Sequence, residues 1–462
     1  MNVTGLIFVI VAHFISGSGI IRLFKINLPV TATLCISMIT GVVVLSIAPC
    51  LLQLAGIPIN QLSVILAITI LTSVTGFPLL KNTRRFRFHK FLWPEIYEWP
   101  FIAIFTMLLF ISAWRCFYYP PTPYDMITGP ELLAEYAVRE HTMISSVFNI
   151  DLHMTNNYFK SPFITGLQII YKLLVCPFGQ IWLSLLYISF IIWLYTIARE
   201  KLHPVLAGLL MLFFITVPDL YAYSFLMLYD FSNMILFFCG FYFINKYFIN
   251  NELNNFLFSS FLFGLATYIR NETLILVCLV LPLLALYFYR QKLNFARSIR
   301  LLFLFFGVPA VFYFICLFVF VKNFVPVHFD VGSQLNSHLS DFSPFLVRLM
   351  DINSELIFSK FGMGSYGYFI YFFCGLLLLD LLWKRRFHKE TIVSLYGVLV
   401  VYFGLPFLGY LLPLVDLMNT TKRGLFKLLP LMFLYICNSG TLIQLSAIIK
   451  KWEAKTVNKN IV

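Results

Sequence analysis

The sequence predicts an all-α, multi-pass membrane protein with about thirteen transmembrane helices. Of its 462 residues 60% are hydrophobic and only 11% are charged, whereas soluble domains carry about 25% charged residues. The apolar residues form long runs, many near the roughly 20 residues that a helix needs to cross a bilayer. They do not follow the alternating segments of about ten residues that are typical of an outer-membrane barrel. A helical bundle is therefore expected.

The candidate spans follow one another along the whole chain and leave no room for a large soluble domain. They lie at residues 4–21, 29–53, 61–80, 99–117, 178–198, 204–222, 224–247, 255–270, 273–289, 299–322, 365–383, 391–415 and 425–448. The first three form a predicted N-terminal three-helix membrane segment, residues 1–80. Residues 81–450 form the predicted main bundle, and residues 451–462 a cytoplasmic tail.

The basic residues predict how the bundle is oriented. The net charge is +13, and basic residues gather in short clusters between spans, as the positive-inside rule requires. These clusters are Lys81, Arg84, Arg85, Arg87 and Lys90; Arg290, Lys292, Arg297 and Arg300; Lys384, Arg385, Arg386 and Lys389; and Lys450 and Lys451. Membrane topology explains this charge, so nucleic-acid binding is not expected. If all four clusters are cytoplasmic, residues 118–177 and 323–364 lie on the outer face.

The first of these outer segments predicts amphipathic helices at the membrane surface. The stretch ELLAEYAVREHTMISSVF places apolar side chains on one helical face, namely Leu132, Leu133, Tyr136, Ala137 and Met143. Residues 160–177 are apolar but are interrupted by charged and polar residues and are too short to span. They predict a second helix in the interface.

Several charged residues lie in or beside apolar runs, where they are costly and therefore candidates for function. They are Asp125 after a proline-rich turn, Asp230 at the start of a span, Arg270 and Glu272 in a polar break, and the basic pair Lys422 and Arg423. Each also has a structural interpretation: a helix cap, an ion pair, a polar plug or a snorkelling side chain. The nine Cys and eight His show no spacing typical of metal ligands, so no metal site is predicted.

The order of these features resembles the GT-C superfamily of membrane glycosyltransferases, which includes protein O-mannosyltransferases and aminoarabinose transferases. The resemblance covers about residues 99–448. It is carried by YYPPTPYDMITGPELLAEYAVREHTM with Asp125, YFKSPFITGLQIIYKLL with Lys160 and Pro162, YDFSNMILFFCGFYFI with Asp230, FLFGLATYIRNETLILV with Gly264, Leu265, Ala266, Arg270 and Glu272, and TTKRGLFKLLPLMFLY with Arg423 and Pro430. Ser161 stands where the aminoarabinose branch carries a second proline.

The resemblance implies an inverting glycosyltransferase that acts at the outer face of the cytoplasmic membrane. It would move a sugar from a polyprenyl-phosphate donor to a hydroxyl of a glycan, lipid or protein acceptor, among membrane lipids. Asp125 would be the catalytic base, and Asp230, the second catalytic candidate, would orient the acceptor or a basic partner. Lys160, Arg270 and Arg423 would bind the donor phosphate, and Glu272 would orient Arg270.

No cofactor beyond the lipid-linked donor is implied, and the involvement of a divalent metal is left open. Two alternatives remain at this stage: a transporter or flippase for lipid-linked saccharides, and a saccharide polymerase that would use Arg139 and Arg348.

Overall fold

The computed structural model describes residues 2–81, 94–149, 160–325, 341–384, 389–412 and 416–459. Within these ranges the regular elements are all helices. Six members of the predicted cytoplasmic clusters lie outside the described residues: Arg84, Arg85, Arg87, Lys90, Arg385 and Arg386.

The helices of the first half begin and end as follows. They are α1 (Val3–Leu23), α2 (Val30–Leu45), α3 (Ala48–Leu54), α4 (Gln61–Lys81), η1 (Ile96–Glu98), α5 (Trp99–Tyr118), α6 (Tyr124–Met126), η2 (Ile127–Glu131), α7 (Leu132–Glu140), η3 (Ser146–Asn149), α8 (Phe163–Leu174), α9 (Ile181–Lys201), α10 (Pro204–Ile215) and α11 (Pro218–Tyr223).

The second half continues with longer helices broken by short ones. They are α12 (Tyr229–Asn250), α13 (Leu253–Ile269), α14 (Thr273–Cys278), α15 (Leu281–Arg290), α16 (Phe295–Phe314), η5 (Ile315–Val321), α17 (Lys322–Phe324), α18 (Ser343–Asp351), η7 (Ile352–Ile357), α19 (Lys360–Tyr366), α20 (Phe369–Lys384), α21 (Lys389–Leu411), η8 (Leu417–Thr421), α22 (Lys422–Gly424), η9 (Leu425–Lys427), α23 (Leu428–Cys437) and α24 (Gly440–Lys459).

The apolar helices support a multi-pass membrane protein. Among the described residues, eight helical segments are long and apolar enough to cross a membrane, or ten if two bent pairs each count as one span. One pair, α19 and α20, bends by 94° where Gly367 adopts a φ of 58°, a conformation that suits glycine. The predicted total of thirteen is not confirmed, because α10 has only 12 residues and α13 only 17.

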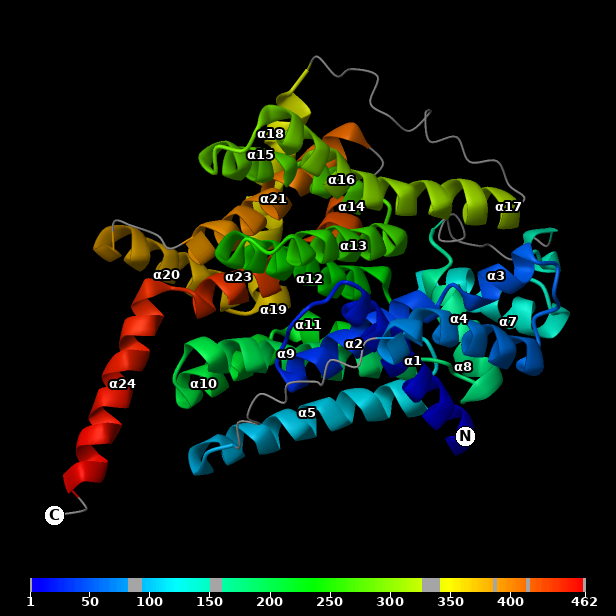
Figure 1. The fold of residues 1–462 in the computed structure, drawn as a ribbon, viewed down its shortest axis with the longest axis horizontal. Helices are drawn as coiled ribbons and strands as arrows, with labels where there is room; N and C mark the ends of the chain where they lie inside the picture. Colours follow the sequence, from blue (N-terminus) through cyan, green and yellow to red (C-terminus); the bar gives the residue numbers. More distant parts are fainter. Residues whose placement is uncertain are drawn as a thin grey trace.

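The main helices run between two ends of the molecule, right and left in Figure 1. We call them the α8 end and the α24 end. At the α24 end, an ion pair joins Lys201 to Glu390 at 2.6 Å, and His203 Nε2 lies 3.0 Å from Glu453 Oε2. At the α8 end, the amide of Ile59 donates to the carbonyl of His141 at 2.8 Å. These contacts join helix ends at each end of the bundle, and which end faces outward stays a prediction.

The N-terminal segment forms the three predicted apolar helices, with α2 and α3 as one span, and packs against the bundle. A Cβ built on Gly17 would lie 1.8 Å from the Ser37 carbonyl oxygen, so only glycine allows α1 and α2 to approach this closely. Across the boundary to the main bundle, His13 Nε2 and the Tyr171 hydroxyl are 3.1 Å apart. The segment therefore shares its core with α8.

The predicted surface helices form at the expected positions as α7 and α8. The predicted face of α7 is partly buried, because Ala137 is inaccessible and Leu132, Leu133 and Tyr136 are half-buried. Most of α8 is buried, including Phe163, Leu167 and Tyr171, because it packs against the N-terminal helices and α9. The placement of these helices at an outer membrane face stays a prediction.

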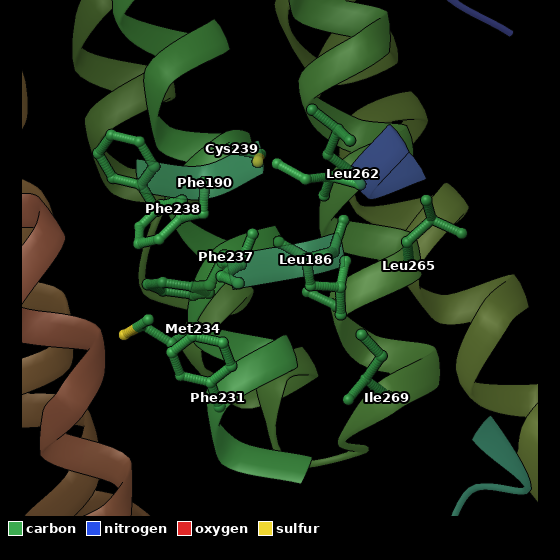
Figure 2. Close-up of a cluster of buried hydrophobic side chains, with 14 of the residues drawn as sticks. Leu186, Phe190, Phe231, Met234, Phe237, Phe238, Cys239, Leu262, Leu265 and Ile269 are labelled. Atoms are coloured by element: carbon green, nitrogen blue, oxygen red, sulfur yellow. The ribbon is translucent and has the colours of Figure 1, made fainter. Parts of the chain in front are cut away.

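The core that positions the site lies between α9, α12 and α13 (Figure 2). The rings of Phe190 and Phe238 meet edge to face at 5.7 Å, a favourable aromatic geometry. Leu262 and Ile269 of α13 are inaccessible or nearly so. Because α12 and α13 are antiparallel neighbours joined by a two-residue turn, the start of α12 and the end of α13 lie at the same end of the bundle.

Candidate functional site

The site is built first from Arg270, which lies at the break between α13 and α14. Its backbone is extended, with φ −139° and ψ 114°, so α13 ends here. The guanidinium pairs through Nη1 with Asp230 in the first turn of α12. Through Nε it contacts Glu272 Oε1 at 2.8 Å, and through Nη2 it donates to Glu272 Oε2 at 2.8 Å. One arginine thus joins two carboxylates.

This group of three charges is shielded from solvent. The side chain of Arg270 is 7% exposed, that of Asp230 5% and that of Glu272 19%. A buried charge is stable only when it is paired and hydrogen-bonded, and a guanidinium fork matches a carboxylate in two parallel bonds. The negative charge of Asp230 is also favourable in the first turn of a helix. The structure therefore places Arg270, Asp230 and Glu272 together, as the sequence predicted for Glu272 and Arg270.

A second, looser pair joins segments 298 residues apart. Arg423 Nη1 of α22 lies 3.4 Å from Asp125 Oδ2 of α6. The Asp125 side chain is 44% exposed, which makes it the most accessible carboxylate of the predicted site. The residue at the N-cap of α6 is Pro123 and Asp125 lies inside the helix, so an N-cap role does not account for Asp125.

Lys160 is affected by the charges of both the Arg270 group and the Arg423–Asp125 pair. Its Nζ lies 5.6 Å from the centre of the Tyr229 ring, and the Tyr229 hydroxyl donates to the Ser161 carbonyl at 2.9 Å. The side chain reaches the surface, yet the surrounding protein excludes much of the bulk water from its amino group. This burial, together with the positive charge of Arg270, lowers the pKa of Lys160 to about 8.

Three further charges have smaller effects on the pKa of Lys160. The charges of Glu272 and Asp125 raise the pKa of Lys160, and that of Arg423 lowers it. Arg270, Glu272, Arg423 and Asp125 thus all lie near enough to act electrostatically on Lys160, and Asp230 joins them through its ion pair with Arg270.

Sequence reasoning missed Lys427, the last residue of η9. Its side chain is only 1% exposed, and its Nζ has no hydrogen-bond partner among the described residues. Burial alone would raise the pKa of Glu272, but the positive charges of Arg270, Lys427 and Lys160 outweigh burial, so this pKa lies below its ordinary value. A signal was present in TTKRGLFKLLP, because Arg423 and Lys427 are four residues apart and share a helical face.

Lys422 does not belong to this group. It pairs with Asp219 at 2.7 Å and lies over the ring of Phe361, 4.3 Å from its centre. The remaining site has four cationic residues, Lys160, Arg270, Arg423 and Lys427, against three carboxylates. This gathering of basic side chains favours a small anionic group.

A mainly apolar groove opens beside Lys160. It encloses about 400 Å³, its open mouth included. Its lining comes from residues 133–148 and 160–165, from Tyr229 at the start of α12, and from η5, α17 and the residue after it. It consists of Leu133, Met143, Phe148, Lys160, Ser161, Pro162, Thr165, Tyr229, Phe320, Val321, Phe324 and Val325. Such a lining suits a hydrocarbon chain whose polar end reaches Lys160.

Among the described residues, no group of three or more His, Cys, Asp or Glu side chains is placed to hold a metal ion. Comparisons of the chain with protein-family models, curated proteins and solved structures find no match. The chemistry of the site therefore has to be inferred from its own residues. Its basic side chains can bind an anion, and the accessible carboxylate of Asp125 can act as a base.

Proposed function

We propose that the protein is an inverting glycosyltransferase that uses a polyprenyl-phosphate-linked sugar. The observation that carries this proposal is the meeting of basic side chains, Lys160 and Arg423 among them, with the accessible carboxylate of Asp125, next to an apolar groove. A lipid-linked donor has matching parts: a phosphate, a sugar and a long hydrocarbon tail.

The proposed reaction is a single displacement. The oxygen of an acceptor hydroxyl attacks the anomeric carbon of the sugar while the bond from that carbon to the phosphate oxygen breaks. The hydroxyl proton passes to the Asp125 carboxylate, which acts as a general base. Polyprenyl phosphate leaves with the bonding electron pair. One carboxylate and an anionic leaving group imply inversion at the anomeric carbon.

The cations have distinct parts in this proposal. Lys160 is accessible and makes no ion pair with a described carboxylate, so it binds the phosphate directly. Arg423 is held only loosely by Asp125 at 3.4 Å and can turn toward the phosphate. Together they stabilise the charge that develops on the leaving phosphate.

Arg270, Asp230 and Glu272 then act as positioning residues. Arg270 is already engaged by two carboxylates and fixes the break between α13 and α14 next to Lys160. Lys427 contributes a buried charge, which acts over several ångströms where little water screens it. Asp230 has the second of its expected roles, the orientation of a basic partner.

The proposal places the reaction at the outer face of a cytoplasmic membrane. The basic clusters support this sidedness through the positive-inside rule. The α8 end, which carries the site, is the end that this rule puts outside. The acceptor would be a hydroxyl of a glycan, a lipid or a protein.

A transporter or flippase for lipid-linked saccharides is the main alternative, and one experiment separates the two. The purified protein in nanodiscs would be incubated with polyprenyl-phosphate sugars that carry a radiolabelled sugar, together with acceptor mixtures from membranes. Transfer predicts release of unlabelled polyprenyl phosphate and label in a new product. Binding of the donor without release of polyprenyl phosphate, combined with its movement between leaflets in vesicles, would overturn the proposal.

A further inference from the structure

A second groove lies away from the candidate site, where two helical turns meet. The α12–α13 turn contributes Asn251 and Leu253, and the α15–α16 turn contributes Gln291 and Leu293. The groove encloses about 1070 Å³, its open mouth included. In Figure 1 these turns lie toward the left, whereas α7 and α8 lie on the right. The groove is therefore not part of the candidate site.

The two walls of the groove are tied together by side chains. Asn251 ends α12 in a left-handed conformation with φ 56°, which asparagine tolerates better than most residues. The Tyr287 hydroxyl of α15 donates to Asn251 Oδ1 at 2.5 Å. This bond links the two turns, so the groove is a built feature of the bundle.

The face of α16 that lines the groove is divided into a basic and an apolar half. Arg297 and Arg300 lie in its first two turns, and Leu301 and Leu304 lie farther along. Spacings of three, four and seven residues put these side chains on one helical face. From Arg297 to Leu304 the helix rises about 10 Å.

The two arginines have no protein partner that would explain them. Both are exposed, and among the described residues neither makes a hydrogen bond or an ion pair. Arg297 and Tyr247 both line the groove. Two guanidinium groups with free donors favour an anion with several oxygen atoms, and a phosphate has that shape and charge.

The apolar half of the lining favours a phospholipid over a soluble phosphate ester. Leu253 is 49% exposed and Leu304 44%, so the apolar wall is open to whatever enters the groove. A soluble phosphate ester would leave these side chains uncovered. A phospholipid would cover them with the first part of its acyl chains while its head group stays near the helix ends.

We propose that this groove binds an anionic phospholipid, with the phosphodiester on Arg297 and Arg300 and an acyl chain along Leu301 and Leu304. The site is independent of the proposed transferase. It lies at the membrane leaflet where the basic turns are, and basic pockets between helices suit anionic head groups there. The bound lipid would join the α12–α13 pair, on which Asp230 and Arg270 are carried, to α15 and α16.

The test is retention of lipid by the purified full-length protein. Native mass spectrometry after release from nanodiscs would compare phosphatidylglycerol with phosphatidylcholine. We expect the wild type to retain phosphatidylglycerol preferentially, and the double variant Arg297→Ala, Arg300→Ala to bind it about 30-fold more weakly. The control is Lys450→Ala, Lys451→Ala, which removes the same charge from α24, a helix that projects away from the bundle in Figure 1.

Three results would overturn the proposal. The first is equal retention of both lipids by the wild type, and the second is an equal loss in the control variant. The third is displacement of phosphatidylglycerol by millimolar sn-glycerol 3-phosphate, which would show that a phosphate alone is enough. Both variants change exposed side chains, so they are expected to fold.

Discussion

Replacing Arg270 with Gln tests whether the buried group around Arg270 holds the break between α13 and α14 in place. The change removes a positive charge from between Asp230 and Glu272, whose side chains are 5% and 19% exposed. Two neighbouring carboxylates would then lie in a poorly hydrated place without their cation. Lys427, which has no hydrogen-bond partner among the described residues, compensates only from a distance.

The expected loss of stability is large. Removing one partner of a buried ion pair costs about 3–5 kcal/mol, because the other charge stays buried and uncompensated. The double variant Arg270→Gln, Asp230→Asn removes one of the stranded charges. It should therefore lose less than the sum of the two single changes, with a coupling of up to about 3 kcal/mol.

The matched control applies the same substitution to an exposed pair. Arg139 pairs with Glu135 at 2.9 Å, but their side chains are 68% and 41% exposed, and exposed pairs contribute about 1 kcal/mol or less. The assay is reversible unfolding of the purified protein by sodium dodecyl sulfate, followed by circular dichroism. A cost for Arg270→Gln no greater than for Arg139→Gln would refute the reasoning.

Three further predictions concern the site and its orientation. Because protonated Lys160 binds phosphate, donor affinity should be full below the Lys160 pKa of about 8 and fall as the pH rises through it; titration of donor binding should show that Lys160→Arg removes this fall. Lys427→Met should weaken binding of polyprenyl phosphate about tenfold, since one charge is lost in a poorly screened place, whereas an unchanged Kd would exclude Lys427 from the site. On a Cys-free background, an impermeant maleimide added to intact cells should label Thr128→Cys but not Lys292→Cys, and the reverse would overturn the topology.

The sequence identified most residues of the site, but it did not show most of the ion pairs that they form. Arg270 and Asp230 stood out because each interrupts an apolar run, where an unpaired charge is too costly to persist. That they pair with each other depends on the antiparallel packing of α12 against α13, which apolar composition alone does not determine. Arg270 was predicted to bind phosphate, but its two carboxylate partners favour a positioning role.

Lys427 was missed because it lies within the Leu- and Pro-rich stretch that follows Arg423. An isolated lysine there suggests a snorkelling side chain, and only the packing of η9 shows that it is buried. The helix count could not be obtained from hydropathy for a related reason. α10 and α13 are short, and hydropathy does not show where a helix begins and ends inside an apolar run.

The central claim is that Asp125 is the base of a sugar transfer, and Asp125→Asn tests it most directly. Asn keeps the size of the side chain but cannot accept the acceptor proton. With a lipid-linked donor, the account predicts a loss of about 10²- to 10⁴-fold in kcat and little change in donor affinity. Asp219→Asn is the control, because that carboxylate pairs with Lys422 outside the site. Transfer by the Asp125→Asn variant at the wild-type rate would contradict the account.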